Sequence, residues 1–269
     1  MDKGKIFRDL HSTGAPFIIP NPWDIGTAKL LASCGFRALA TTSAGYAFSR
    51  GLPDGGVGFE AMIAHCREIV AATVLPVSAD LENGKGDTPE SAAETVFAAA
   101  AAGLAGCSIE DHTGDARKPI YDFALAVERV AAAAQAARAL KHDFVFTARA
   151  ENYLWNRPDK DDTIKRLQAF EAAGADVLYA PGLGDIATVT EVCAAVTKPV
   201  NVLAIPDFTV KALGEAGASR ISLGSKLTTF AFGMLENASR EMLRAGNFGF
   251  ARAAMPFSRA QALFETPEE

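Results

Sequence analysis

Two carboxylates follow an apolar run in the segment Val77–Gly86, and a glycine-rich turn comes directly after them. Because alternate residues of a strand point to the same side, Asp80 and Glu82 are predicted to project together. Oxygen ligands of this kind suit Mg²⁺, with Mn²⁺ as an alternative, rather than zinc. Acidic residues also end strands as ordinary turn formers. The pair therefore predicts a hard-cation site only if further ligands lie nearby.

Other apolar runs also carry polar residues, mostly where the run ends. In chain order they are Thr42-Ser43-Ala44-Gly45-Tyr46, Glu110-Asp111-His112, Arg149-Ala150-Glu151-Asn152, Asn201 and Gly224-Ser225-Lys226. Several carboxylates beside an arginine are typical of a divalent-metal site that also binds an anionic substrate, because arginine grips a carboxylate through paired hydrogen bonds. A metal there would polarise a carbonyl oxygen, and backbone donors of the Ser43–Gly45 turn would stabilise an enolate. We therefore expect chemistry on 2-oxo acids.

Each of these residues also has a simpler interpretation. Arg149 could merely pair with Glu151 or another carboxylate, and His112 could be a solvated loop residue. Asp111 could cap the next turn instead of meeting substrate. Ser225 and Lys226 could bind a phosphate or simply begin the helix that follows. These alternatives stay open at the level of sequence.

The elements that must position these residues alternate along the chain. Eight short apolar or β-branched runs are predicted strands: Phe17–Asn21, Arg37–Thr42, Leu75–Asp80, Gly106–Glu110, Phe144–Arg149, Ala175–Ala180, Val200–Ala204 and Ser219–Leu223. Eight amphipathic segments are predicted helices: Ile25–Ser33, Phe59–Ala72, Pro89–Ala102, Asp122–Leu140, Lys160–Ala172, Asp185–Ala195, Asp207–Glu215 and Leu227–Ala245. This repetition predicts an α/β fold, a single (β/α)₈ barrel over residues 1–269 with a C-terminal helical segment over 227–269. A doubly wound open sheet is the alternative.

Composition agrees with one domain and limits the partners. The chain has 269 residues, of which 49% are hydrophobic and 22% charged, and these proportions allow a substantial core. The amino terminus lacks the apolar core of a signal peptide and no apolar run reaches about 18 residues, so we expect a cytoplasmic protein without membrane contact. A net charge of −6 argues against nucleic acid as a partner. The four cysteines are dispersed through apolar segments without metal-ligand spacing, so we expect them to be buried free thiols.

The ordered motifs of the chain resemble the isocitrate lyase and phosphoenolpyruvate mutase superfamily over nearly its whole length. They are Asn21-Pro22-Trp23-Asp24, Thr42-Ser43-Ala44-Gly45, Leu52-Pro53-Asp54, Asp80-Leu81-Glu82-Asn83-Gly84, Ile109-Glu110-Asp111, Ala148-Arg149 and Pro199-Val200-Asn201. The resemblance implies Asp80 as the direct Mg²⁺ ligand. It implies that Glu82, Glu110 and Asp54 act mainly through metal-bound waters.

The same resemblance implies how a small anionic substrate would be held. Ser43, Ala44 and Gly45 would bind a substrate carboxylate or its 2-oxo oxygen. Arg149 would hold the carboxylate and Asn201 would lie near the reacting end. Members of the superfamily are commonly homotetramers whose last helix swaps between neighbours, so we expect a homo-oligomer, dimer or tetramer.

Two departures from the superfamily pattern bear on the reaction. The loop after the fourth strand, His112–Tyr121, is short and lacks the Lys-Lys-Cys-Gly-His motif whose cysteine is the general acid of the lyases. Pro181 stands where the lyases have a glutamate and the phosphonate mutases a histidine. Cleavage of isocitrate or 2-methylisocitrate is therefore disfavoured.

The favoured function is a Mg²⁺-dependent lyase that decarboxylates an oxaloacetate-like acid through an enolate. The catalytic candidates are Arg149, Glu110, Tyr46 and His112. Cleavage of a C–C bond in a substituted malate is the alternative, with Tyr46, His112 or Tyr121 as the acid. A phosphonopyruvate-type mutase or hydrolase is a third interpretation, and a dicarboxylate-binding barrel without turnover is the non-enzymatic one.

Overall fold

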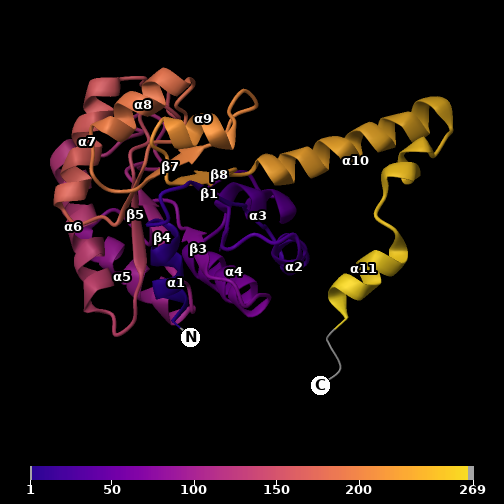
Figure 1. Cartoon of the computed structure of the whole chain (residues 1–269), viewed down its shortest axis with the longest axis horizontal. Helices are drawn as coiled ribbons and strands as arrows, with labels where there is room; N and C mark the ends of the chain where they lie inside the picture. The colour runs from indigo at the N-terminus through magenta and orange to yellow at the C-terminus, as the bar shows by residue number, and fades with distance from the viewer. Residues whose placement is uncertain (1, 266–269) are drawn as a thin grey trace.

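Eight parallel strands form one sheet that curls into a nearly closed barrel in the computed structural model, which describes residues 2–265 (Figure 1). The strands are β1 (Phe17–Ile19), β2 (Leu39–Ala40), β3 (Val77–Asp80), β4 (Gly106–Glu110), β5 (Val145–Arg149), β6 (Val177–Tyr179), β7 (Val200–Leu203) and β8 (Arg220–Ser222). Their order is β1-β8-β7-β6-β5-β4-β3-β2. Ala40 N donates a 3.0 Å hydrogen bond to Pro20 O and so joins the two ends of that order. The predicted barrel is confirmed.

Helices follow the strands, and most of them cover the outside of the barrel (Figure 1). They are α1 (Lys3–Leu10), α2 (Ile25–Ser33), α3 (Ser43–Ser49), α4 (Phe59–Ala71), α5 (Pro89–Ala101), α6 (Phe123–Ala139), α7 (Lys160–Ala172), α8 (Ile186–Ala194), α9 (Val210–Glu215), α10 (Lys226–Ala245), the 3₁₀ helix η1 (Gly249–Ala253) and α11 (Phe257–Phe264). All eight predicted helices are present. The sequence did not predict α1, α3 or α11.

Helix α1 closes the barrel at the amino ends of the strands. Asp2 caps the helix by accepting hydrogen bonds from the backbone of Gly4 and Lys5. Phe7 is fully buried in an apolar cluster that includes Phe17 at the start of β1. This helix therefore forms the floor of the barrel.

A short helix, α3, replaces the turn that was predicted after the second strand. Thr42 caps it, because the Thr42 hydroxyl accepts a hydrogen bond from Gly45 N at 3.2 Å. Gly45 also packs closely against α10, since a Cβ added there would lie 2.5 Å from the hydroxyl of Thr228. The turn interpretation was therefore wrong for Ser43–Gly45, which form the first turn of a helix.

The side chain of Asn21, just after β1, contacts the segments on both sides of that strand. Its amide nitrogen donates to Ala40 O at 3.2 Å and to Thr41 O at 3.1 Å. Its amide oxygen accepts from Leu223 N at 2.9 Å and from Gly224 N at 3.0 Å. Asn21 thereby links β2 and the end of β8.

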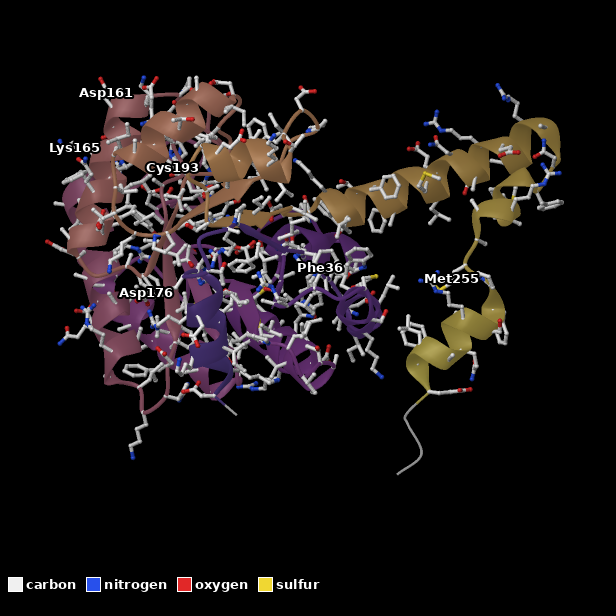
Figure 2. The ribbon with its side chains drawn as sticks, in the orientation of Figure 1. Phe36, Asp161, Lys165, Asp176, Cys193 and Met255 are labelled. Atoms are coloured by element: carbon white, nitrogen blue, oxygen red, sulfur yellow. The ribbon has the colours of Figure 1, made fainter. Side chains whose placement is uncertain are left out.

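The C-terminal segment leaves the barrel as an arm. Helix α10 projects outward, and the chain then turns back so that α11 lies beside α2 (Figure 1). Large apolar side chains project from this arm into solvent, as the stick view shows (Figure 2), and they include Phe230, Leu235, Leu243, Phe248 and Phe257. Within residues 2–265 no helix has the length and apolar character needed to cross a membrane.

The cysteines only partly match the expectation of buried thiols. Cys66 and Cys107 are buried, Cys193 is half-buried and Cys34 is exposed. No disulfide joins the cysteines of the described chain.

Candidate active site

A cavity of about 770 Å³ opens at the carboxyl ends of the strands. The predicted site residues that line it are Ser43, Ala44, Asp54, Asp80, Glu82, Glu110, His112, Arg149 and Asn201. Two predicted site residues are not among its lining: Gly45, which packs against α10, and Tyr46, whose ring stacks on His65 at 3.7 Å between centroids. The structure thus brings most of the predicted set together and directs Tyr46 away from the cavity.

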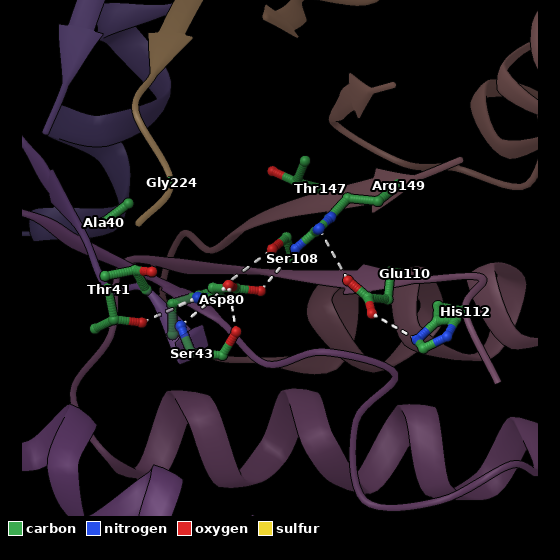
Figure 3. Close-up of polar contacts among 12 residues, drawn as sticks. Ala40, Thr41, Ser43, Asp80, Ser108, Glu110, His112, Thr147, Arg149 and Gly224 are labelled. Carbon is green, nitrogen blue, oxygen red and sulfur yellow. Dashed lines mark hydrogen bonds and ion pairs between the residues drawn. The ribbon is translucent and has the colours of Figure 1, made fainter. Parts of the chain in front are cut away.

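Asp80, the last residue of β3, is held in place from three directions (Figure 3). Its backbone nitrogen donates to the Thr41 hydroxyl at 3.0 Å. Its carboxylate Oδ2 accepts from Ser43 N at 3.2 Å and from Ser43 Oγ at 2.8 Å. Its Oδ1 lies 2.7 Å from Nη1 of Arg149. The start of α3 and the end of β5 therefore fix this carboxylate in the cavity.

Arg149, the last residue of β5, contacts three carboxylates. Besides Asp80, its Nη2 lies 2.9 Å from Glu110 Oε2 and 2.9 Å from Glu151 Oε1. Burial lowers the pKa of Arg149, but the charges of Glu110, Glu151 and Asp80 outweigh it and raise that pKa. The simpler interpretation, pairing with Glu151 or another carboxylate, is confirmed by all three contacts. Arg149 also lines the cavity.

The remaining carboxylates repel one another across the cavity. Burial, followed by the charges of Asp80, Glu110 and Asp54, raises the pKa of Glu82 to about 7. Burial and the charges of Asp80 and Glu110 likewise raise the pKa of Asp54. A cluster of carboxylates whose pKa values rise through burial and through mutual repulsion is an environment that a cation would stabilise.

Glu82 reaches the cavity by a route that the sequence did not predict. Strand β3 ends at Asp80, so strand alternation does not place Glu82. The backbone of Glu82 instead adopts φ 52°, in the left-handed region that non-glycine residues rarely occupy. The two carboxylates do share the cavity, but through a strained turn.

This donor set fits Mg²⁺. Within residues 2–265 no three His, Cys, Asp or Glu side chains are arranged to ligate one ion directly. Mg²⁺ does not require that, because it keeps several waters and is commonly bound through one or two carboxylates. Asp80, expected to be the direct ligand, lines the same cavity as Glu82, Glu110 and Asp54, which are expected to act through bound water.

His112 lies beside this cluster at the end of β4. Its Nδ1 is 3.6 Å from Glu110 Oε1, and its ring stacks on Trp155 at 3.7 Å (Figure 3 shows the Glu110 contact). Its Nε2 is buried and has no hydrogen-bond partner in the described protein. The loop that follows folds back on itself, since His112 bridges to Ile120. His112 is therefore an ordered cavity residue and not a solvated one.

Asp111 and Tyr121 support the site from outside the cavity lining. The carboxylate of Asp111 is buried, accepts from Glu151 N at 2.8 Å and pairs with Arg166 at 3.1 Å. Its interpretation as a turn cap is wrong. The Tyr121 hydroxyl donates to Asp87 and accepts from Asn83 at 3.0 Å, so both of its hydrogen-bonding roles are occupied.

The lining residues that sequence reasoning missed include Trp155, Tyr179, Arg220 and Ser222. Tyr179 and Arg220 lie on the two strands next to Asn201 and pair with it in register. Their side chains therefore point to the same face of the sheet as that of Asn201, which was predicted. Strand register could have found these two. Trp155 lies in a loop, and no local pattern indicates its stacking on His112.

A profile of the phosphoenolpyruvate phosphomutase family matches residues 7–243. An uncharacterised protein of Mycobacterium tuberculosis is 35% identical over 221 residues, which cover 81% of each chain. A 2-methylisocitrate lyase of Escherichia coli is 30% identical over 226 residues, which cover 79% of this chain and 75% of that lyase.

Solved structures of related proteins share this fold. A Burkholderia cenocepacia protein assigned provisionally as a lyase or mutase is 51% identical, with a TM-score of 0.96 and coverage of 99% of this chain and 96% of that one. Oxaloacetate acetylhydrolase in complex with its product oxalate is 25% identical, with a TM-score of 0.86 and coverage of 97% and 93%. The match over most of its length shows that the chain belongs to the phosphoenolpyruvate phosphomutase family, within the superfamily of phosphoenolpyruvate mutases and isocitrate lyases.

Proposed function

We propose that this protein is a Mg²⁺-dependent lyase that acts on a small 2-oxo or 2-hydroxy carboxylic acid, with decarboxylation of an oxaloacetate-like acid as the favoured reaction. The observation that carries the proposal is the contact of Arg149 with Asp80 and Glu110, because an arginine that would bind an anion then lies next to carboxylates that would bind a cation. A 2-oxo acid offers a carboxylate and a ketone oxygen at adjacent carbons. Those two groups match this pair of binding functions. The similarity to oxaloacetate acetylhydrolase supports the same substrate type.

Asp80 would hold Mg²⁺, with Glu82, Glu110 and Asp54 around it. When bound, this ion supplies Lewis-acid stabilisation of the negative charge that develops on the 2-oxo oxygen. The guanidinium of Arg149 would donate to the substrate carboxylate and fix its orientation. Ser43, whose backbone and hydroxyl both face Asp80, would donate to oxygen atoms in the same region. Departure of CO₂ leaves an enolate, which solvent water protonates to give pyruvate.

A second candidate is cleavage of a C–C bond in a substituted malate, and His112 favours it. This reaction needs a proton donor for the departing carbanion. His112 lines the cavity, its Nδ1 faces Glu110, and its buried Nε2 has no hydrogen-bond partner in the described protein. An imidazolium whose Nδ1–H is directed at Glu110 would donate its Nε2 proton to the departing carbon and become a neutral imidazole. The relation to 2-methylisocitrate lyase supports this chemistry.

The test is pyruvate release from oxaloacetate by the purified protein, with Mg²⁺ and then with excess chelator, above the background caused by the metal alone. We expect enzyme-dependent release that chelator abolishes and that Asp80→Asn reduces by about 100-fold or more. Glu60→Gln, on the exposed face of α4, is the matched control and should retain full activity.

Two other outcomes would change the assignment. Release of a 2-oxo acid from a substituted malate, without turnover of oxaloacetate, would favour the C–C lyase. Mg²⁺-dependent binding of oxalate without turnover of any acid in the panel would favour a binding protein and overturn the enzymatic proposal.

A further inference from the structure

A row of polar side chains crosses five neighbouring strands of the barrel. Register pairs Glu110 with Arg149, Arg149 with Tyr179, Tyr179 with Asn201, and Asn201 with Arg220. All five residues line the cavity. The row begins at the acidic cluster and ends at a second arginine, so the two ends of the cavity differ in charge.

Arg220 is buried, with 5% of its surface exposed, and its hydrogen bonds go to neutral groups. Its Nε donates to Asn201 Oδ1 at 2.8 Å and its Nη2 to Thr147 Oγ1 at 3.0 Å. Its Nη1 lies 3.3 Å from His11 Nε2. Among residues 2–265 no carboxylate oxygen lies within 4.0 Å of this guanidinium. A buried arginine is normally paired with an anion, because an unpaired buried charge is costly.

His11, at the end of α1, contributes no compensating charge. Its Nδ1 lies 2.9 Å from the carbonyl oxygen of Phe7, so Nδ1 carries the proton and donates it. Nε2 is therefore the atom that accepts from Arg220. Burial and the charge of Arg220 lower the pKa of His11 to about 3, so the ring stays neutral at physiological pH. The positive charge of Arg220 thus remains uncompensated by the protein.

Arg220 also fixes the orientation of the Asn201 amide. Arginine only donates hydrogen bonds, so the atom of Asn201 that faces it must be the oxygen. The amide nitrogen then points the other way, where it donates to Ser222 Oγ at 2.9 Å. One N–H donor of Asn201 is left for the cavity that this residue lines.

We propose that Arg220 is a positioning residue that makes Asn201 a hydrogen-bond donor and, together with it, selects substrates that carry a second carboxylate at the end remote from Arg149. Asn201 stands two strands from Arg149, roughly 10 Å along the sheet. The cavity therefore accepts 2-oxo dicarboxylates in preference to 2-oxo monocarboxylates. This inference rests on the proposed function and specifies its substrate class.

The decisive variant is Asn201→Asp. The new carboxylate would pair with Arg220, cancel its charge and remove the donor from the cavity. We expect 3,3-difluorooxaloacetate, a dicarboxylate, to bind at least 10-fold more weakly in the presence of Mg²⁺. Oxalate has no remote carboxylate, and its affinity should change less than threefold. Calorimetric titration of both ligands into wild type, Asn201→Asp and Arg220→Met measures this difference.

Thermal unfolding tests whether Arg220 and Asn201 position a hydrogen-bond donor or merely stabilise the fold. Asn201→Asp should melt no lower than wild type because it completes an ion pair, whereas Asn201→Leu, which removes the same hydrogen bonds, should melt lower. A loss of dicarboxylate affinity in the stable Asp variant supports the inference. Equal weakening of oxalate and the dicarboxylate, or no weakening, would overturn it and leave the proposed function intact. Failure of wild type to bind oxalate with Mg²⁺ would overturn both.

Discussion

The guanidinium of Arg149 and the carboxylate of Asp80 form a 2.7 Å ion pair, although one is expected to hold an anion and the other a cation. The pair keeps both side chains in the cavity and limits the conformations that each can adopt. Each residue therefore acts as a support for the other as well as a ligand in its own right. Removing either one has consequences for stability as well as for binding.

Arg149→Met should destabilise the fold as well as abolish turnover. It leaves Glu110 and Glu151 buried without their cation, and breaking such a pair costs about 3–5 kcal/mol. Urea denaturation measures the loss in free energy of unfolding. The double variant with Glu151→Gln should recover part of that loss, because it removes one of the unpaired charges. An Arg149→Met protein as stable as wild type would contradict this account.

Replacing Glu82 should separate stability from function. Its φ of 52° costs about 1–2 kcal/mol for a non-glycine residue. Glu82→Gly and Glu82→Ala both remove the carboxylate, and only glycine also removes the strain. We expect both variants to lose Mg²⁺-dependent activity, and the glycine variant to have the higher free energy of unfolding by about 1 kcal/mol. The prediction is wrong if the alanine variant is the more stable one in urea.

His65 should make the fold less stable as the pH falls. Burial lowers its pKa from 6.5 to about 4, so between these values folded His65 binds fewer protons than unfolded His65. The contribution of His65 to the free energy of unfolding is therefore fully present above pH 6.5. It falls as the pH is lowered toward 4, by at most about 1.4 kcal/mol per pH unit.

His65→Phe keeps an aromatic ring against Tyr46 and removes the titration. Thermal melts of both proteins from pH 7.5 to 4.5 test this, because every other titrating group is shared. We expect wild type to lose more stability than the variant in acid. Parallel pH profiles would exclude a contribution from His65.

The C-terminal arm should mediate self-association. Leu243 is 89% exposed and Phe257 83% exposed, and an apolar surface of this extent on a projecting arm is typical of an interface. We propose that a second copy of the chain covers it, with an exchange of the arm between copies. Light scattering should show a dimer or tetramer at micromolar concentration, and Leu235→Glu with Leu243→Glu should give smaller species.

Val74→Glu is the control for the arm variants, because Val74 is equally exposed but lies on the barrel, between α4 and β3. It should leave the assembly unchanged. A wild-type protein that is monomeric throughout the micromolar range would refute the proposed role of the arm.

The sequence predicted the barrel well because each strand and helix repeats a local signal. The helices that the sequence did not predict lack such a signal. Helix α1 offers few apolar residues, of which Phe7 and Leu10 are buried, and helix α3 begins with the threonine, serine and glycine that also form turns. In both cases contacts with distant segments decide the conformation.

The candidate site likewise contains some residues that the sequence predicts and others that it does not. Asp80, Glu110 and Arg149 could be predicted because parallel strands bring their carboxyl ends to one mouth. Tyr46 and His112 looked equally suitable as acids, but a side-chain direction set by helix phase sends Tyr46 onto His65. Strand register could have placed Arg220 in the cavity, but not the absence of a carboxylate partner, because its acceptors come from three segments far apart in the chain.

Asn21 has a consequence for how the protein acquires activity. Its side chain joins the end of β1 to residues 202 and 203 positions later, and it also lines the cavity. Closing so long a loop is slow compared with the formation of single helices and strand pairs. During refolding, secondary structure should therefore return before the cavity does. No fragment that lacks either the first or the last strand contains the complete site, and catalytic activity during refolding would mark the moment at which these two strands meet.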